Sequence, residues 1–478
     1  QTHTRLVRLT MPPPSPSPSS FISLTLLFLL PSIVYAYSNN VELSIGADKT
    51  LAIVDPVYST AQRFSDYFND LQGDGHELTI VPSTSSTIVI KEFGEYLYDN
   101  IIIFAPKTSS FNSLSFHDLL SFVDHGGNLV LGLEGGMSKN MRLFAENCGI
   151  EFDSKTSEVI DHFNYYRSNI SIGGDVSHNT VMASNVIKSE AVLGEFSHNA
   201  HLASVLYRGV GHAVEEDNVL AVKVLRGNPT SYSSDRAKDI SSFPDNAGSD
   251  TLLVTGIQAR NNARVLVSGS LDMFSNEFFR AEDGRYGNRV FCREVTRWTT
   301  GKAGVLRFSN ITHYRSDGSP ADLILHEKKR PDLPTTLYPD PELTRSSLVY
   351  RVKDEIVFGI TLQELKQGKW VPFAPTDLQL EFVMLDPYIR TTMNCDPQTG
   401  RCHASFIAPD DYGVFKFRVL YRRSGYSTIH TETQVSIRPF KHNEYERFIP
   451  SAYPYYTSAF AVMIGFLAFS VSFYFSSD

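Results

Sequence analysis

The chain has 478 residues, of which 42% are hydrophobic and 20% are charged, and its formal net charge is -9 at pH 7. This composition is that of ordinary folded domains, with enough apolar material for two or three cores. The acidic balance, without a cluster of lysines and arginines interleaved with aromatic residues, argues against a protein that binds nucleic acid.

Residues 1–36 are expected to be absent from the mature protein. A Pro/Ser-rich stretch from Met11 leads into the apolar run 21–30, and the small-residue pattern Val34-Tyr35-Ala36 follows. This arrangement is typical of a secretory signal peptide that is cleaved after Ala36. A second membrane helix is the weaker interpretation, because the run is short and is broken by Pro31. Residues before Met11 are interpreted as translated upstream sequence.

Residues 37–303 are predicted to form an α/β region. Short apolar runs alternate with segments whose apolar residues recur at helical spacing. The expected strands are residues 51–54, 77–81, 101–104, 129–131, 221–225, 252–255 and 265–268, and a helix is expected over 289–300. Apolar strands separated by helices indicate a parallel sheet that is covered on both faces. The region forms either one large unit or two, at about 41–150 and 151–303.

Residues 304–440 are predicted to form a β-sandwich of Ig-like size. Leu380 and Phe382 alternate with polar residues, and so do Phe415 and Phe417, which is the pattern of strands with one wet face. A polar juxtamembrane linker is expected over 441–457.

Residues 458–475 carry no charge and predict a transmembrane helix. At ~1.5 Å per residue the run reaches ~27 Å, roughly the hydrocarbon thickness of a bilayer. With the signal peptide, this span predicts a type I membrane protein whose bulk is luminal and whose cytosolic tail is residues 476–478. A stripe of small residues predicts close packing against another helix, although such residues are common in membrane helices: Ala461, Gly465, Ala468 and Ser472.

The cysteines and two sequons fit the secretory pathway. Cys395 and Cys402 bracket a turn-rich loop that an oxidising lumen could close. Cys148 and Cys292 are either buried thiols or a pair. The triplets at Asn169 and Asn310 are candidate glycosylation sites.

Ligands of open parallel sheets bind beyond the carboxyl ends of the strands, which here means Asp55, Pro106 and the loop Glu134-Gly135-Gly136. The glycines do not form a phosphate-binding pattern, and a Gly-x-Ser-x-Gly elbow is absent from the sequence.

Histidines offer the other candidates for acid/base or metal work, at Asp161-His162 and at His198 and His201. A third ligand is not present at motif spacing from either group, so structural or surface histidines are the better interpretation. The residues therefore predict no catalytic, cofactor-binding or metal site.

Several long segments resemble a known family. They are GEYLYDNIIIFAP (94–106), CGIEFD (148–153), VIDHFNY (159–165), GIQARNNARVLVSGSLDMFS (256–275), GKWVPF (368–373), LQLEFVMLDPYIRT (378–391) and YERFIPSAYPYY (445–456). Together they span nearly the whole mature chain and are similar to the 48 kDa subunit family of oligosaccharyltransferase.

The resemblance implies a non-catalytic subunit of the endoplasmic-reticulum complex that transfers an oligosaccharide from dolichyl diphosphate to Asn in Asn-x-Ser/Thr. In the family the chemistry belongs to a multi-span partner with a Trp-Trp-Asp motif, whereas Trp298 and Trp370 are isolated here. Expected partners are that catalytic subunit, a ribophorin II-like subunit, the defender-against-death subunit, a ribophorin I-like subunit and membrane lipid. Family members often carry tail lysines that this chain lacks, so either the chain is truncated or its residence depends on its partners.

Two alternatives stay open. The first α/β unit resembles amidotransferase-type or flavodoxin-like domains at the level of fold, which leaves room for a luminal enzyme or ligand-binding protein with a site near Asp55 and Glu134. A free-standing cell-surface adhesion protein is the other. Whether the luminal crevice contacts donor glycan or acceptor peptide is also open.

Overall fold

The computed structural model describes residues 48–56, 61–86, 88–109, 111, 114–166, 178–197, 204–235, 243–244, 246–327, 344–445 and 447–476.

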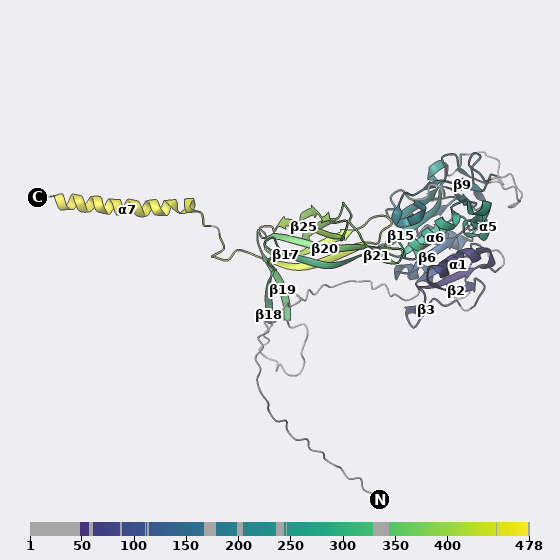
Figure 1. Cartoon of the computed structure of the whole chain (residues 1–478), viewed down its shortest axis with the longest axis horizontal. Coiled ribbons are helices and arrows are strands. Elements are labelled where there is room, and N and C mark those ends of the chain that lie inside the picture. The colour runs from purple at the N-terminus through teal and green to yellow at the C-terminus, as the bar shows by residue number, and fades with distance from the viewer. Residues whose placement is uncertain are drawn as a thin grey trace, which may run out of the picture. The chain divides into compact units, whose positions relative to one another are not determined.

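The N-terminal region is built on parallel strands in the spatial order β2-β1-β5-β6-β16. Figure 1 labels two of them, β2 and β6. The apolar runs of β1, β5, β6 and β16 are buried on both faces, as expected of a covered parallel sheet, whereas β2 at the edge is largely exposed. Their bounds are β1 (Asp48–Val54), β2 (His76–Pro82), β5 (Asn100–Phe104), β6 (Asn128–Gly132) and β16 (Arg264–Ser268).

The sheet is mixed, which corrects the expectation of a parallel sheet throughout. β15 (Leu252–Gln258) pairs antiparallel with β16, and β13 (Ala221–Arg226) pairs antiparallel with β15. The physical reason is the short connection between β15 and β16, where the Ala259 N–H donates to the Ala263 carbonyl at 2.9 Å. A tight turn of this kind joins antiparallel neighbours, because a parallel crossover needs a dozen or more residues. Further antiparallel strands are β10 (Asn185–Val186), β12 (His212–Val214) and β7 (Ile150–Phe152).

Helices cover both faces of this sheet. Alternate residues of β1 point to opposite sides, so Ala52 and Val54 join one core while Leu51 and Ile53 join the other. The first core contains residues of α1 (Ser65–Gly73) and α6 (Asn288–Thr299), and the second contains residues of α2 (Phe116–Asp124) and α3 (Lys139–Asn147). Smaller elements are β3 (Lys91–Glu92), β4 (Glu95–Tyr96), β8 (Ser157–Ile160), β9 (Val181–Ala183), β11 (Val205–Tyr207), β14 (Tyr232–Asp235), α4 (Glu190–Leu193), α5 (Asn276–Phe279), η1 (Ala61–Phe64), η2 (Gly194–Ser197), η4 (Gly248–Asp250), η5 (Asp272–Phe274) and η6 (Ala281–Gly284).

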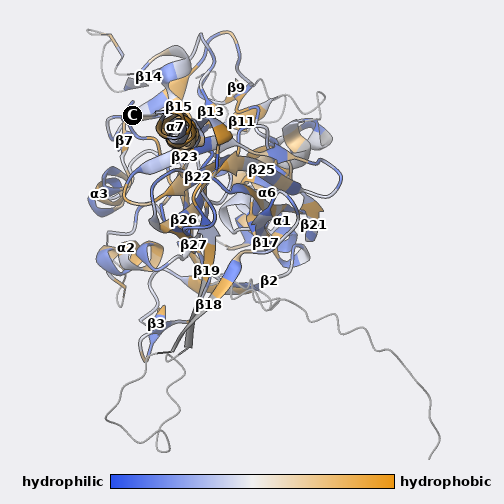
Figure 2. Cartoon of the chain, turned by 90° about the vertical axis from the view of Figure 1, so that its left-hand side faces the viewer, coloured by the Kyte–Doolittle hydropathy of each residue, from blue (hydrophilic) through white to orange (hydrophobic). Residues whose placement is uncertain are grey.

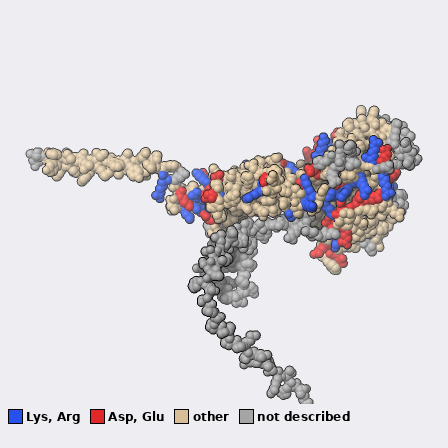
Figure 3. Space-filling model, viewed as in Figure 1, with Lys and Arg blue, Asp and Glu red and all other residues tan. Residues whose placement is uncertain are grey.

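The outer surface of α1 and α6 is held by an ion-pair ladder. Asp66, Asp70 and Asp74 recur at every fourth residue of the α1 segment, and Arg280, Arg289 and Arg293 pair with them in that order. Figure 3 shows the blue and red side chains interleaved over this face.

The C-terminal half contains many strands around a separate apolar core. In the described part of the chain one sheet has the order β17-β20-β25-β24, with β21 on β20, and the other has the order β18-β19-β27-β26-β22-β23. The predicted alternation is confirmed, since Leu380, Phe382, Phe415 and Phe417 are all buried in this core. The bounds are β17 (Leu306–Arg315), β18 (Asp322–Glu327), β19 (Thr344–Arg351), β20 (Glu355–Lys366), β21 (Lys369–Pro372), β22 (Gln379–Val383), β23 (Pro387–Thr392), β24 (Asn394–Cys395), β25 (Arg401–Ile407), β26 (Gly413–Tyr421) and β27 (Ile429–Arg438).

The turn between β26 and β27 contacts the mixed sheet region. The Trp298 Nε1–H donates to the Gly425 carbonyl at 2.8 Å, and the Gln258 side-chain amide donates to the Tyr426 carbonyl at 2.5 Å. Arg264, which is buried, donates to the carbonyls of Ala303 and Gly304 where the chain passes from one region to the next. These bonds tie the two cores together.

Among the described residues, α7 (Ile449–Phe475) is the helix long and apolar enough to cross a membrane. It begins at Ile449, ahead of the expected start at Ser458. Figure 2 shows it end-on, with hydrophobic residues around its circumference.

Candidate functional site

The carboxyl ends of β1, β5 and β6 bring the predicted residues to one edge of the sheet. Val54 pairs with Phe104 and Ile103 pairs with Leu131, so Asp55, Pro106 and Glu134 follow neighbouring strands at the same edge. Because β5 lies between β1 and β6, Asp55 and Glu134 leave the sheet about 10 Å apart, two strand spacings. Asp55 is 8% exposed, and the Glu134 carboxylate is paired with the Lys107 ammonium at 3.3 Å.

The loop that begins at Glu134 has a structural role. The Met137 N–H donates to the Glu134 carbonyl at 3.2 Å, and the Ser138 N–H donates to the Pro106 carbonyl at 2.9 Å. Ser138 then caps the N-terminus of α3, where its hydroxyl accepts from the Met141 N–H. Gly136 has φ of +80°, a conformation that glycine adopts without strain. These contacts start helix α3 rather than shaping a phosphate cradle.

A carboxylate that the sequence did not single out lies beyond the end of β16. Asp272 is 9% exposed, and it pairs with Arg208 at 2.5 Å and also with Arg63. The three residues come from η5, from the loop after β11 and from η1, so this ion-pair cluster ties distant segments at the sheet edge. Its position directly after a parallel strand is the one signal from which it could have been found.

Two glycines close the end of β16. The Val210 N–H donates to the Gly269 carbonyl at 3.0 Å. A Cβ added at Gly269 would lie 2.0 Å from the Val210 carbonyl oxygen, and one added at Gly209 would lie 2.1 Å from the Gly269 oxygen. The two backbones therefore touch here, and only glycine permits this approach.

The side chains of Asp161 and His162 have different hydrogen-bond partners and do not form one site. The Asp161 carboxylate is fully buried and accepts from the backbone N–H of Phe163 at 2.9 Å and of Asn164 at 3.0 Å, and from the Thr230 hydroxyl at 2.9 Å. Burial raises its pKa, but these hydrogen bonds, with one from Asn228, outweigh burial and the pKa is lowered. The carboxylate organises the loop that follows β8.

The His162 side chain is exposed, by contrast, and belongs to a small aromatic cluster. Its Nδ1 lies 2.6 Å from the His178 Nδ1, and its Nε2 lies 2.9 Å from the Tyr232 hydroxyl. His198 and His201 lie outside the described residues. In the part of the chain that the structure describes, no group of three or more His, Cys, Asp or Glu side chains converges as a metal site would.

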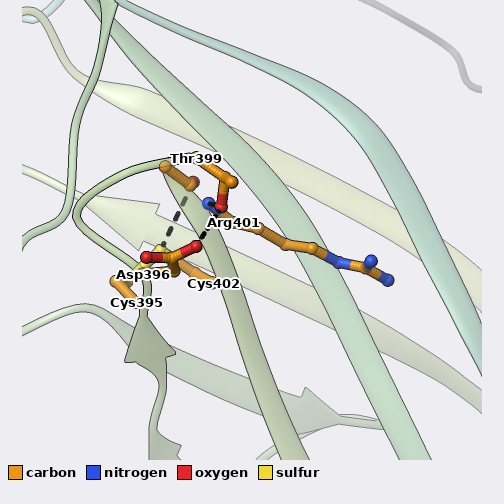
Figure 4. The surroundings of a disulfide bond; sticks show 6 residues. Cys395, Asp396, Thr399, Arg401 and Cys402 are labelled. Atoms are coloured by element: carbon orange, nitrogen blue, oxygen red, sulfur yellow. Dashed lines mark hydrogen bonds between the residues drawn. A yellow bond between two sulfur atoms is a disulfide. The ribbon is translucent and has the colours of Figure 1, made fainter.

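Cys395 and Cys402 are joined by a disulfide. They are paired neighbours on β24 and β25, and the loop between them is ordered by Asp396, which accepts from Thr399 Oγ1 at 2.6 Å (Figure 4). Cys148 and Cys292 are free thiols, which decides between the two alternatives left open for them. Burial raises the pKa of both, that of Cys148 to about 12.

The remaining predicted residues lie at the surface or outside the description. Asn310 is exposed on β17, while Asn169 lies outside the described residues. The stripe Ala461, Gly465, Ala468 and Ser472 is exposed along α7, and a Cβ added at Gly465 would have no atom within 4 Å. The stripe is therefore free to receive another helix, and its role stays a prediction.

Two hollows lie away from the edge that carries Asp55 and Glu134. The larger has a volume of about 550 Å³ and is lined by β10, residues 187–188, Glu216, Asn218, β13 and Ser424. A smaller one of about 40 Å³ shares Val222 and Ser424 with it. The two hollows adjoin at these residues and are together called the β13 groove here.

Comparison with known proteins gives concordant matches along the chain. The family model described as OST48, N-terminal domain matches residues 41–302, and the OST48 middle domain model matches residues 339–477. This chain is also similar to three curated proteins named dolichyl-diphosphooligosaccharide--protein glycosyltransferase 48 kDa subunit. The Drosophila melanogaster protein is 37% identical over 89% of this chain and 90% of its own length. The corresponding figures are 34%, 95% and 98% for Arabidopsis thaliana, and 37%, 90% and 92% for Danio rerio.

Proposed function

The chain belongs to the family of the 48 kDa subunit of dolichyl-diphosphooligosaccharide--protein glycosyltransferase, and we propose that it is an accessory, non-catalytic subunit of this oligosaccharyltransferase complex. In this role it supports N-linked glycosylation by bracing the catalytic subunit, which transfers the oligosaccharide from dolichyl diphosphate to Asn in Asn-x-Ser/Thr. A ribophorin II-like subunit, the defender-against-death subunit and a ribophorin I-like subunit are the further partners we propose.

The observation that carries the proposal is the surface of α7. Its side chains from Val462 to Phe475 are largely apolar and are exposed on every side, with no part of the span buried in the rest of the chain. A helix that is apolar all round requires lipid or other membrane helices as neighbours. One such helix offers a docking element, whereas a polyprenyl donor needs a site that several spans enclose.

We place the chain in the endoplasmic-reticulum membrane as a single-pass type I protein with its bulk in the lumen. The Cys395–Cys402 disulfide supports this placement, because disulfides persist in oxidising compartments. The exposed sequon at Asn310 is compatible with the same side of the membrane.

We assign residues 37–303 to a luminal region of the flavodoxin-like or amidotransferase-like kind and residues 304–440 to an Ig-like sandwich. The strand order β2-β1-β5-β6-β16 supports the first assignment, since in chain order it is the 2-1-3-4-5 arrangement of flavodoxin-like sheets. Two sheets around one core, antiparallel apart from the parallel pair of β19 and β27, support the second. Residues 441–457 would link them to a span at 458–475 and a tail at 476–478.

The proposal is tested on the tagged chain solubilised in digitonin. Gly465→Leu with Ala468→Leu should reduce co-purification of the catalytic subunit, because both changes place a large side chain where a second helix would approach closely. Ser470→Leu is the matched control: at ~100° per residue Ser470 lies on the opposite face of α7, so recovery should be unchanged. Equal recovery from both variants would remove the stripe from the proposal.

A second experiment separates an accessory role from a luminal enzyme. Asp55→Asn with Glu134→Gln keeps the shape of both side chains and removes their charge. A glycosylation reporter should remain fully modified in cells that carry this variant at normal abundance. Loss of modification with the complex intact would favour a site at the sheet edge instead.

A further inference from the structure

We infer that the β13 groove binds an acidic segment of polypeptide in an extended conformation, added as a strand to the part of β13 that β10 leaves unpaired. The groove is lined by cations from four separate segments of the chain. They are Lys188, Lys223, Arg226, Arg260, Arg422 and Arg423.

The cations of the groove differ from most arginines of the described chain in lacking acidic partners. Along α1 and α6 each arginine faces an aspartate, and Arg423 likewise pairs with Asp377 at 2.5 Å. Within the described residues, Lys188, Lys223, Arg226, Arg260 and Arg422 form no ion pair. These five cations outnumber Glu216, the carboxylate that also lines the groove, so the net potential in the hollow is positive and favours a ligand that carries several carboxylates.

The backbone of β13 offers the second element of recognition. Its pairing with β10 is confined to Leu225 and Arg226, with one further bond from the Ile187 N–H to the Val224 carbonyl. On the opposite side, the Gln258 N–H donates to the Leu220 carbonyl at 2.9 Å, so β15 bonds Leu220 and, by alternation, Val222.

By the same alternation, the backbone groups of Ala221 and Lys223 point away from β15, to the side of the groove. The Ala221 N–H is used by a turn to Asn218, at 3.2 Å, which leaves the Ala221 carbonyl and the Lys223 N–H. In the described part of the chain no strand pairs with β13 at these positions on this side. An extended peptide can complete the ladder there, as in other cases of strand addition.

Two side chains shape which peptide fits. Val219 is 94% exposed at the rim and offers an apolar contact. Glu216 is the carboxylate in the lining, and it repels an acidic residue placed beside it. Since the side chains of a strand alternate between two faces, the best ligand alternates acidic and apolar residues. A free anion such as diphosphate would pair with the cations of the groove but would not form a strand ladder with the backbone of β13.

The test uses the full chain purified in detergent and a fluorescein-labelled peptide of alternating Glu and Val, about eight residues long, the usual scale of a strand. Fluorescence anisotropy should show saturable binding that weakens when salt rises from about 0.05 to about 0.5 M. Arg226→Gln with Arg422→Gln should raise the Kd at least about tenfold, the scale of one or two charge-assisted contacts. Lys139→Gln with Lys369→Gln, which removes two exposed cations elsewhere, should leave the Kd unchanged.

Strand addition has its own readout. The same peptide with alternate backbone nitrogens methylated keeps its charge but cannot donate to β13, and it should bind at least about tenfold more weakly. Equal binding of the methylated peptide, or displacement of the parent peptide by inorganic diphosphate at equal charge concentration, would overturn the proposal and leave a simple anion site. Equal affinity in the Arg226/Arg422 variant would overturn the location.

Discussion

The mixed sheet region is expected to lose stability steeply as the pH falls from 7 to 5, because it holds neutral histidines in its interior. His212 is fully buried on β12, and its Nε2 lies 2.7 Å from the Thr255 hydroxyl. Its Nδ1 has no hydrogen-bond partner among the described residues. Burial lowers the pKa of His212 to about 3. His76, beside Thr50, has its pKa lowered to about 4, chiefly by burial and then by the charge of Lys302.

The sign of the effect follows from proton uptake. In the unfolded chain a histidine has its ordinary pKa near 6.5, so between pH 6.5 and the folded pKa the unfolded state binds more protons. Stability therefore falls as the pH falls through this window. For one histidine that stays neutral when folded, the unfolded state gains ~2.1 kcal/mol from protonation at pH 5 and ~0.2 kcal/mol at pH 7. Each buried histidine thus accounts for about 1.9 kcal/mol of lost stability, and His76 with His212 for about 4 kcal/mol.

The assay is urea unfolding followed by tryptophan fluorescence in a Trp370→Phe background, which leaves Trp298 as the reporter of the mixed sheet region. His212→Gln keeps a polar contact to Thr255 but cannot be protonated, so the loss between pH 7 and 5 should shrink by about 1.9 kcal/mol. His117→Gln, which replaces an exposed histidine, is the comparison variant and should retain the loss that His212 causes. A His212→Gln variant with the full loss would refute the reasoning, and so would a His212 resonance that titrates near pH 6.5 in the folded protein.

Three further outcomes follow from the packing. Cys402→Ser removes the disulfide to Cys395 and should lower the free energy of unfolding of the C-terminal strand region by about 2 to 3 kcal/mol. The assay is urea unfolding followed by Trp370 fluorescence, and an unshifted midpoint would contradict the prediction. Gly269→Ala places a methyl group against a backbone carbonyl and should cost about 2 kcal/mol or more, with poor folding as the visible sign. Asp70→Asn removes the partner of the exposed Arg289 and should cost less than about 1 kcal/mol, a loss that high salt abolishes.

Much of the architecture could be predicted from local pattern. Runs such as residues 101–104 are buried on both faces, and alternation at Leu380 and Phe382 marks a half-buried strand; each signal lies within a few residues. The direction of β13 and β15 was not predictable in this way, because an apolar run looks the same in a parallel or an antiparallel neighbour. The direction of a strand depends on the length of its connection to the next strand. The regular alternation of strand and helix earlier in the chain suggested long crossovers, so the short connection between β15 and β16 was not recognised.

The candidate sites also differ in whether local sequence is enough to predict them. Asp55 and Glu134 could be placed at one edge because strand ends are visible in sequence. The ion pairs of Asp272 with Arg63 and Arg208 could not be predicted, since these residues lie far apart in the sequence and no motif links them. The β13 groove was missed for the same reason, as its cations are scattered from Lys188 to Arg423 and only the tertiary structure gathers them.

The segment 256–275, which most strongly marks the family, is also the part of the chain with the tightest geometric demands. A Cβ at Gly256 would lie 2.6 Å from the Trp298 ring, so glycine is required for α6 to pack on β15. Asn262 adopts φ of +70° in the turn, and its side chain accepts from the Thr428 N–H at 2.8 Å. The same segment supplies Arg264, Gly269 and Asp272 to the contacts described above. A stretch that must satisfy the sheet, the helix and the second core together tolerates few substitutions. The joint between the two cores therefore depends on this segment, in which most side chains are buried or bonded to another element.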